Sequence, residues 1–132
     1  MELTAAQRAQ FDREGFLVFP DLFSAAEIAV MRQEVERLSQ IHAEEVAREH
    51  TGGVKALFRS HESDGPTASP AFRALSRTAR VQRPVRQVLG TEEIYLYHSK
   101  INAKPAIEGT HWMWHQDYNA WSKDGCPTSN MA

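Results

Sequence analysis

His115 and Asp117 are the residues whose type and spacing are best suited to chemistry. They lie in the run HWMWHQDYNAW, residues 111–121. If this run is a β-strand, side chains two positions apart point to the same face, so the imidazole and the carboxylate can reach one ion. One neutral imidazole and one carboxylate suit a divalent first-row metal. The spacing therefore predicts two metal ligands, although His-x-Asp is a short pattern that also arises by chance.

Three more polar residues precede this run. His98, Lys100 and Asn102 alternate along EIYLYHSKINAK, residues 93–104, which is rich in β-branched and aromatic residues and is predicted to be a strand. By the same period of two they share one face. A histidine, a lysine and an amide side by side would form a floor for a small anion. The residues alone leave open the alternative that this face is a solvated sheet surface.

Helix signals dominate the first part of the chain. Thr4 with Gln7, and Ser24 with Glu27, have the spacing of capping boxes, and Gly15 is a stop signal for the first helix. Two further helices are predicted, from Pro70 and from about Ala79 to Gly90.

Four segments are predicted to be strands. Two are short, Phe16–Phe19 and Val54–Phe58, and the other two are Glu93–Lys104 and His111–Tyr118. Helices come first and the sheet last, so the sequence predicts an α+β fold. We expect a mostly helical lead-in over residues 1–90 and the start of a β core over 91–132.

Composition excludes several classes of function. A formal net charge of −2 and a pI near 6.3 give no basic surface for nucleic acid. No apolar run approaches about 18 residues, so we expect no membrane segment. Cys126 is the only cysteine, which predicts a cytoplasmic protein without an internal disulfide. The oligomeric state does not follow from these residues.

A family resemblance joins these features. The run YLYHSKINAKPAIEGTHWMWHQDYNAWSKDGCPTSNM, residues 95–131, resembles the metal-binding region of the phytanoyl-CoA dioxygenase family. The shared features are a strand ending in Asn-x-Lys-Pro, a short glycine-containing turn and Trp-His-Gln-Asp-Tyr. Upstream segments resemble the family's helical lead-in, so the likeness covers nearly the whole chain. It implies the cosubstrate 2-oxoglutarate and Fe(II), which this family uses.

The resemblance implies roles residue by residue. His115 and Asp117 match the first two iron ligands. Asn102 matches a strand position that contacts 2-oxoglutarate in related hydroxylases, and we extend this role to Lys100. His98 matches a position that touches substrate in the ectoine-hydroxylase branch.

The sequence also departs from that branch. The branch usually has glutamine where His98 stands, and tends to have Ser-Asp-Phe where this chain has Gln-Asp-Tyr after His115. The sequence therefore fits the general family better than the branch. Trp121 is a candidate for lining the substrate pocket, with packing as the alternative.

The implied fold and activity are those of a longer protein. The family builds a double-stranded β-helix of the jelly-roll or cupin type, and takes a second histidine and a 2-oxoglutarate-binding arginine from strands further downstream. After Asp117 this sequence has no histidine and no arginine. We therefore expect a single, apparently truncated domain, an N-terminal fragment that is inactive alone.

Two functions remain in view for the parent protein. The resemblance favours an Fe(II)- and 2-oxoglutarate-dependent dioxygenase that hydroxylates a small molecule. The alternative is a non-catalytic, cupin-like binding or assembly module that uses the same face without redox chemistry.

Overall fold

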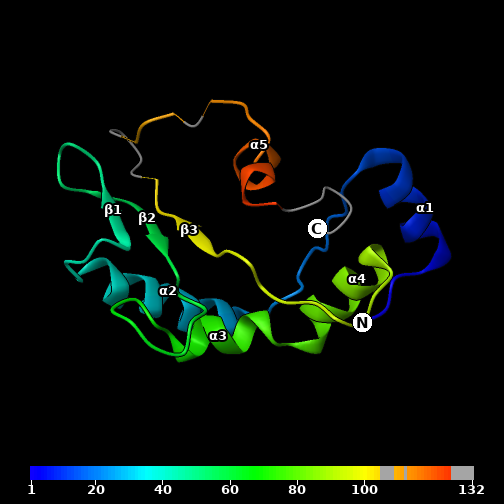
Figure 1. Cartoon of the computed structure of the whole chain (residues 1–132). Helices are drawn as coiled ribbons and strands as arrows, with labels where there is room; N and C mark the ends of the chain where they lie inside the picture. The colour runs from blue at the N-terminus through cyan, green and yellow to red at the C-terminus, as the bar shows by residue number, and fades with distance from the viewer. Residues whose placement is uncertain (105–108, 112, 126–132) are drawn as a thin grey trace. The chain divides into compact units, whose positions relative to one another are not determined.

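The computed structural model describes residues 1–104, 109–111 and 113–125. Its elements are α1 (Ala5–Glu14), α2 (Ala25–Ser39), β1 (Val46–Arg48), β2 (Val54–Phe58), α3 (Pro70–Ser76), α4 (Ala79–Leu89), β3 (Lys100–Asn102), α5 (Tyr118–Trp121) and a 3₁₀ turn, η1 (Ser122–Asp124) (Figure 1). None of the helices in these ranges has the length and apolar character needed to cross a bilayer. The chain divides into two compact units.

The first unit combines residues 1–18, 79–94 and 111–132, and contains α1, α4, α5 and η1. Thr4 and Gln7 form the predicted capping box of α1, and Gly15 closes the helix in the left-handed conformation with φ of 79°. That conformation is strained for any residue with a Cβ atom. The backbone N–H of the buried Leu3 donates to the Gln87 side chain of α4 over 2.7 Å, which joins the chain start to that helix.

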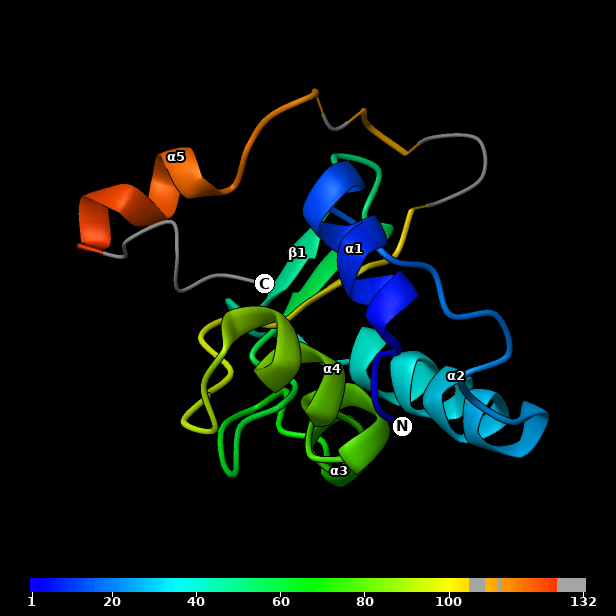
Figure 2. The same ribbon diagram turned by 90° about the vertical axis from the view of Figure 1, so that its right-hand side faces the viewer.

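The second unit combines residues 19–78 and 95–110 around an antiparallel sheet of order β1-β2-β3. Ser24 and Glu27 form the predicted capping box of α2. This helix contacts both β2 and α3, and the two ribbon views agree that it runs beside the sheet (Figure 2). Two of its neighbours, β1 and β2, form a hairpin with an irregularity in register between Ala47 and Arg48.

The core of the second unit lies between α2 and the sheet. Leu38 of α2 and Leu57 of β2 have no exposed surface, and Val46 of β1 is 6% exposed. Partly buried side chains pack around these three: Val35, Ile41, Val54, Phe72 and Ile101. Burying such side chains is the main favourable contribution to folding, so this cluster holds α2, α3 and all three strands together.

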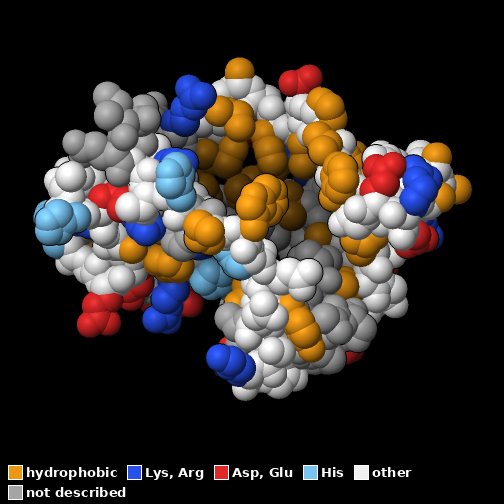
Figure 3. Space-filling view, turned by 90° about the horizontal axis from the view of Figure 1, so that it is seen from above, with side chains coloured by type: hydrophobic (Ala, Val, Ile, Leu, Met, Phe, Trp, Pro, Cys, Tyr) orange, Lys and Arg blue, Asp and Glu red, His pale blue; other side chains and the backbone are white. Residues whose placement is uncertain are grey.

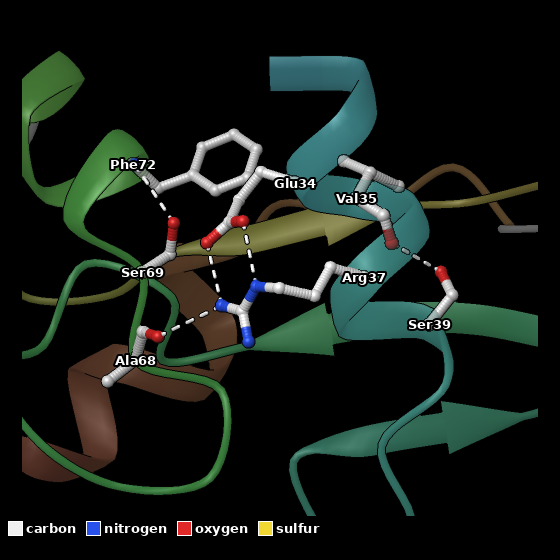
Figure 4. A network of polar contacts seen from close by, with 7 residues as sticks. All are labelled: Glu34, Val35, Arg37, Ser39, Ala68, Ser69 and Phe72. Carbon is white, nitrogen blue, oxygen red and sulfur yellow. Dashed lines mark hydrogen bonds and ion pairs between the residues drawn. The ribbon is translucent and has the colours of Figure 1, made fainter. Parts of the chain in front are cut away.

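Polar contacts reinforce the packing of α2 against the start of α3 (Figure 4). Arg37 donates two hydrogen bonds to Glu34, from Nε over 2.8 Å and from a terminal nitrogen over 2.7 Å, and a weaker one to the carbonyl of Ala68. Ser69, which is fully buried, caps α3 by accepting the N–H of Phe72 over 3.2 Å. Arg37 holds the pKa of Glu34 down at about 2, with a smaller contribution from Ser69.

The helix predictions are confirmed and the strand predictions are confirmed only in part. All four predicted helices form, and so does the strand Val54–Phe58. The prediction of a strand at Phe16–Phe19 is wrong, because no partner strand pairs with it. Of Glu93–Lys104 only Lys100–Asn102 pairs, and β1 was missed because three residues give too short a pattern. The α+β class is confirmed.

Large apolar side chains also reach the surface of the described chain (Figure 3). In the second unit these include Tyr95, Leu96 and Tyr97, which are 79%, 44% and 46% exposed. Tyr95 and Tyr97 meet edge to face, with ring centroids 6.4 Å apart. The segment that leads into β3 therefore carries much of the unit's exposed aromatic surface.

Candidate metal and cosubstrate site

His115 and Asp117 lie together, although the backbone that brings them together is not a strand. His115 Nε2 is 3.0 Å from Asp117 Oδ1. The predicted strand over His111–Tyr118 is wrong for the residues that the structure describes there, 111 and 113–118. The chain instead turns at Asp117 and enters α5, where the N–H of Trp121 donates to the Asp117 carbonyl over 3.3 Å. A turn thus produces the proximity that strand alternation was expected to produce.

The other ring nitrogen of His115 contacts a backbone carbonyl. Nδ1 is 2.6 Å from the carbonyl oxygen of Met113. A carbonyl can only accept, so Nδ1 must carry a proton and donate it. Nε2 and the Asp117 carboxylate then stay close because a positive charge lies between them: a proton on Nε2, which makes the contact an ion pair, or a metal ion that both groups bind.

This donor set fits a divalent metal. Bonds of about 2.0–2.2 Å at right angles would place two ligand atoms about 3 Å apart, close to the 3.0 Å found between Nε2 and Oδ1. Metal-bound histidines also commonly donate their second N–H to a backbone carbonyl, as His115 does to Met113. The side chains of His115 and Asp117 are 53% and 63% exposed, so both are accessible to an ion.

Among the described residues, no third histidine, cysteine or acidic side chain joins the pair to complete a three-ligand cluster. His111, the other histidine of this segment, is exposed.

His98 and Lys100 meet at a residue that the sequence analysis did not single out, Phe58 of β2. Lys100 is the register partner of Phe58, and its Nζ lies 5.8 Å from the ring centroid. The His98 ring is 5.9 Å from the same ring at an interplanar angle of 51°. A cation over an aromatic face is attracted by the ring's quadrupole. Only the antiparallel pairing of β2 with β3 reveals Phe58, because it is distant in sequence.

Asn102 lies at the end of β3, and Ser99 lies just before its start. Asn102 is exposed and pairs in register with Ala56. Ser99 Oγ is 2.6 Å from His61 Nδ1, and the Ser99 carbonyl accepts the N–H of Arg59 over 3.3 Å. The loop after β2 therefore holds the chain at Ser99, with His98 and Lys100 on either side of it.

The predicted site residues fall into two groups. His115 and Asp117 belong to the first compact unit, together with Trp121, which is partly buried in α5. His98, Lys100 and Asn102 belong to the second. The roles of all six residues remain predictions.

A carboxylate binds the residue just before the metal-motif segment. Glu49 accepts both the backbone N–H of Thr110, over 3.1 Å, and its hydroxyl, over 3.0 Å. The backbone donor of Thr110 is the largest cause that lowers the pKa of Glu49 below its ordinary value, and Lys55 adds a smaller attraction. The ionised form of Glu49 is therefore the one that binds Thr110.

Comparison with known proteins identifies relatives that match nearly the whole chain. The family model for phytanoyl-CoA dioxygenase (PhyH) matches residues 11–132. The ectoine dioxygenase of Nocardia farcinica is 37% identical over 96% of this chain, and that of Bordetella bronchiseptica is 33% identical over 96%. These relatives come from the ectoine branch, so the likeness to that branch is greater than the sequence analysis allowed.

Solved structures also show similarity to this branch. EctD from S. alaskensis, in a crystal structure with 2-oxoglutarate and 5-hydroxyectoine, aligns with a TM-score of 0.79 and 31% identity over 90% of this chain. A structure of the same protein with bound Fe aligns equally well.

The chain covers less than half the length of each of these relatives. The chain spans 42% of the Nocardia protein, 41% of the Bordetella protein and 42% of the EctD chain. This share fits the expectation that the sequence corresponds to part of a longer domain. With the family model matching all but the first ten residues, the chain belongs to the phytanoyl-CoA dioxygenase family.

Proposed function

We propose that this chain contributes to an Fe(II)- and 2-oxoglutarate-dependent dioxygenase that hydroxylates a small molecule. The carrying observation is the His115–Asp117 pair, whose facing atoms are 3.0 Å apart while Nδ1 of the histidine is engaged by a carbonyl. In this proposal Nε2 of His115 and a carboxylate oxygen of Asp117 are two protein ligands of Fe(II). When bound, the iron would allow O₂ to act as the oxidant, with 2-oxoglutarate supplying two of the electrons as it is decarboxylated to succinate.

The chain's own part in the reaction is to fix ligand geometry. Met113 accepts the Nδ1 proton of His115 and so keeps the lone pair of Nε2 directed toward Asp117. Exchanging this carbonyl partner for water would allow the ring to rotate and would weaken the metal site, as changes around metal ligands commonly do by about 10–100-fold.

Two residues of β3 are proposed to bind the cosubstrate, and His98 and Trp121, which lie outside this strand, to bind the substrate. Lys100 carries a positive charge above the Phe58 ring, and Asn102, two residues later in the strand, carries an amide. Both groups can donate hydrogen bonds to a carboxylate. We assign Asn102 and Lys100 to 2-oxoglutarate, and His98 and Trp121 to the substrate. The contact of His98 and Lys100 with one ring supports a common binding surface for these two residues.

The proposed substrate is a small polar molecule. The relatives named above are ectoine dioxygenases, which makes ectoine the first compound to test. His98, in place of the glutamine usual in that branch, gives this chain an imidazole where the branch has an amide, so we expect a different preference. A cytoplasmic location is also proposed, on the single cysteine of the sequence.

An anaerobic titration tests the proposal. Fe(II) and 2-oxoglutarate are added to the purified chain, and the visible charge-transfer absorption of their chelate is recorded. We expect His115→Ala and Asp117→Asn each to reduce iron binding strongly. The matched control is His111→Ala, which removes an exposed histidine from the same segment.

Two outcomes would contradict the proposal. Iron binding that survives both ligand substitutions would place the metal elsewhere. Metal binding at His115 and Asp117 without any chelate band, even at 2-oxoglutarate concentrations raised to offset its weakened binding, would favour the non-catalytic, cupin-like binding module.

A further inference from the structure

The turn between β1 and β2 is held firmly at its base. Arg48, the last residue of β1, donates to the carbonyls of Ser39 and Ile41 at the end of α2, over 2.8 and 3.2 Å, and to that of Gly52 in the turn over 3.0 Å. One guanidinium thus joins a helix end to the turn. Side-chain donors at a helix C-terminus satisfy carbonyls that have no partner within the helix.

Glu49 is the first residue of this turn, and its backbone is fixed as well. Its N–H donates to the carbonyl of Gly53 over 2.7 Å, and its own carbonyl accepts the N–H of Gly52 over 2.9 Å. Gly52 has φ of 90°, a conformation that favours glycine. The carboxylate of Glu49 therefore projects from a backbone with little freedom.

The same turn and strand bind the chain on both sides of residues 104–109. Before this stretch, the N–H of Ala103 donates to the carbonyl of Lys55 in β2 over 3.0 Å. After it, Thr110 donates its N–H and its hydroxyl to Glu49. Both donors of one residue bind one carboxylate across 61 positions of sequence.

We propose that Glu49 is a positioning residue for the metal motif: by binding Thr110 it fixes the chain at the start of the segment that carries His115 and Asp117. The inference rests on the proposed function for its consequence at the metal, but not for the contact itself. Thr110 precedes His115 by five residues, so fixing it restricts where the following backbone can lie. In this proposal Glu49 acts through Thr110.

The test compares four variants by NMR and by Co(II) titration. Glu49→Ala removes the carboxylate, and Thr110→Val removes the hydroxyl but keeps the backbone donor. Thr110→Ser keeps both donors and is expected to behave as the unaltered chain. Glu44→Ala, which removes an exposed carboxylate shortly before β1, is the matched control.

We expect three changes in Glu49→Ala. Exchange of the Thr110 amide should become at least roughly threefold faster, since its acceptor is gone. The heteronuclear NOE of the amides of residues 113–117 should fall, and the Co(II) dissociation constant should rise. Thr110→Val should show the same changes to a smaller extent, and Glu44→Ala none.

The outcomes separate this inference from the proposed function. Unchanged exchange at Thr110, or faster exchange with unchanged NOE values at residues 113–117, would overturn the positioning role and leave the metal proposal standing. If the unaltered chain binds no Co(II) but Glu49→Ala lowers the NOE values, the positioning role is supported and the metal proposal fails.

Discussion

The sheet with α2 and the segment around His115 form opposite kinds of structure. Leu38, Ala56 and Leu57 have no exposed surface, whereas Met113 and Trp114 are 81% and 103% exposed. In the first region apolar packing defines the backbone. In the second, a few hydrogen bonds, such as that of His115 with Met113, define it. The packed core and the two proposed metal ligands therefore lie in different parts of the chain, and substitutions should separate them.

The largest expected effect concerns turnover. The 132-residue chain should form no substrate-coupled succinate, because we propose two iron ligands in it and its sequence has neither a histidine nor an arginine after Asp117. Lacking a charged partner for the far carboxylate of 2-oxoglutarate should by itself weaken cosubstrate binding at least about tenfold. The measurement is succinate released on exposure of the Fe(II)-loaded chain to O₂. Robust succinate formation would show that a residue such as His98 or His111 completes the site.

The next largest effect is expected in the packed region. Leu57→Ala should lower the free energy of unfolding by about 2–5 kcal/mol, because it leaves a cavity beside Leu38 and Val46. Denaturant unfolding followed by circular dichroism measures the loss. Val30→Ala is the control on α2, since Val30 is 54% exposed and its truncation should cost less than about 0.5 kcal/mol. Equal losses in both variants would contradict the assignment of the core.

The same contrast explains what the sequence could predict. The helices of α1 and α2 were predictable because Thr4 with Gln7, and Ser24 with Glu27, are local signals that act within four residues. The strand at β2 was predictable because it is apolar. The strand expected over His111–Tyr118 is not formed by the described residues there, 111 and 113–118, because strands need partners and alternation does not identify a partner.

The candidate site, like the fold, was predictable only in part. His115 and Asp117 were identified from side-chain chemistry and a spacing of two, and the structure brings their donor atoms within 3.0 Å by a turn. Phe58 and Glu49 were not identified, because each meets its site partner through tertiary contacts: Phe58 with Lys100 across the sheet, and Glu49 with Thr110 across 61 positions.

A smaller effect is expected where α2 meets α3. Glu34→Gln should cost about 1 kcal/mol, a discounted value because Arg37 is half-exposed. The pKa of Glu34 falls from its ordinary 4.5 to about 2, so its contribution is present above pH 4.5 and is lost as the pH falls toward 2. Unfolding titrations at pH 7 and pH 3 measure this. The control is Glu36→Gln, exposed on the same helix, and an equal pH response in that variant would contradict the role of the Arg37 contact.

The smallest effect is expected at Trp114, and it gives the sharpest test of the contrast between the two regions. Truncating a tryptophan in a core costs about 3–5 kcal/mol. Trp114 is fully exposed and next to His115, so Trp114→Ala should change the free energy of unfolding by less than about 0.5 kcal/mol. Denaturant unfolding measures the change, with Trp121→Ala as the comparison, because Trp121 is partly buried in α5 and should cost more. A loss of more than about 1 kcal/mol at Trp114 would mean that this side chain packs against other atoms in solution, and that the motif segment is held by more than its hydrogen bonds.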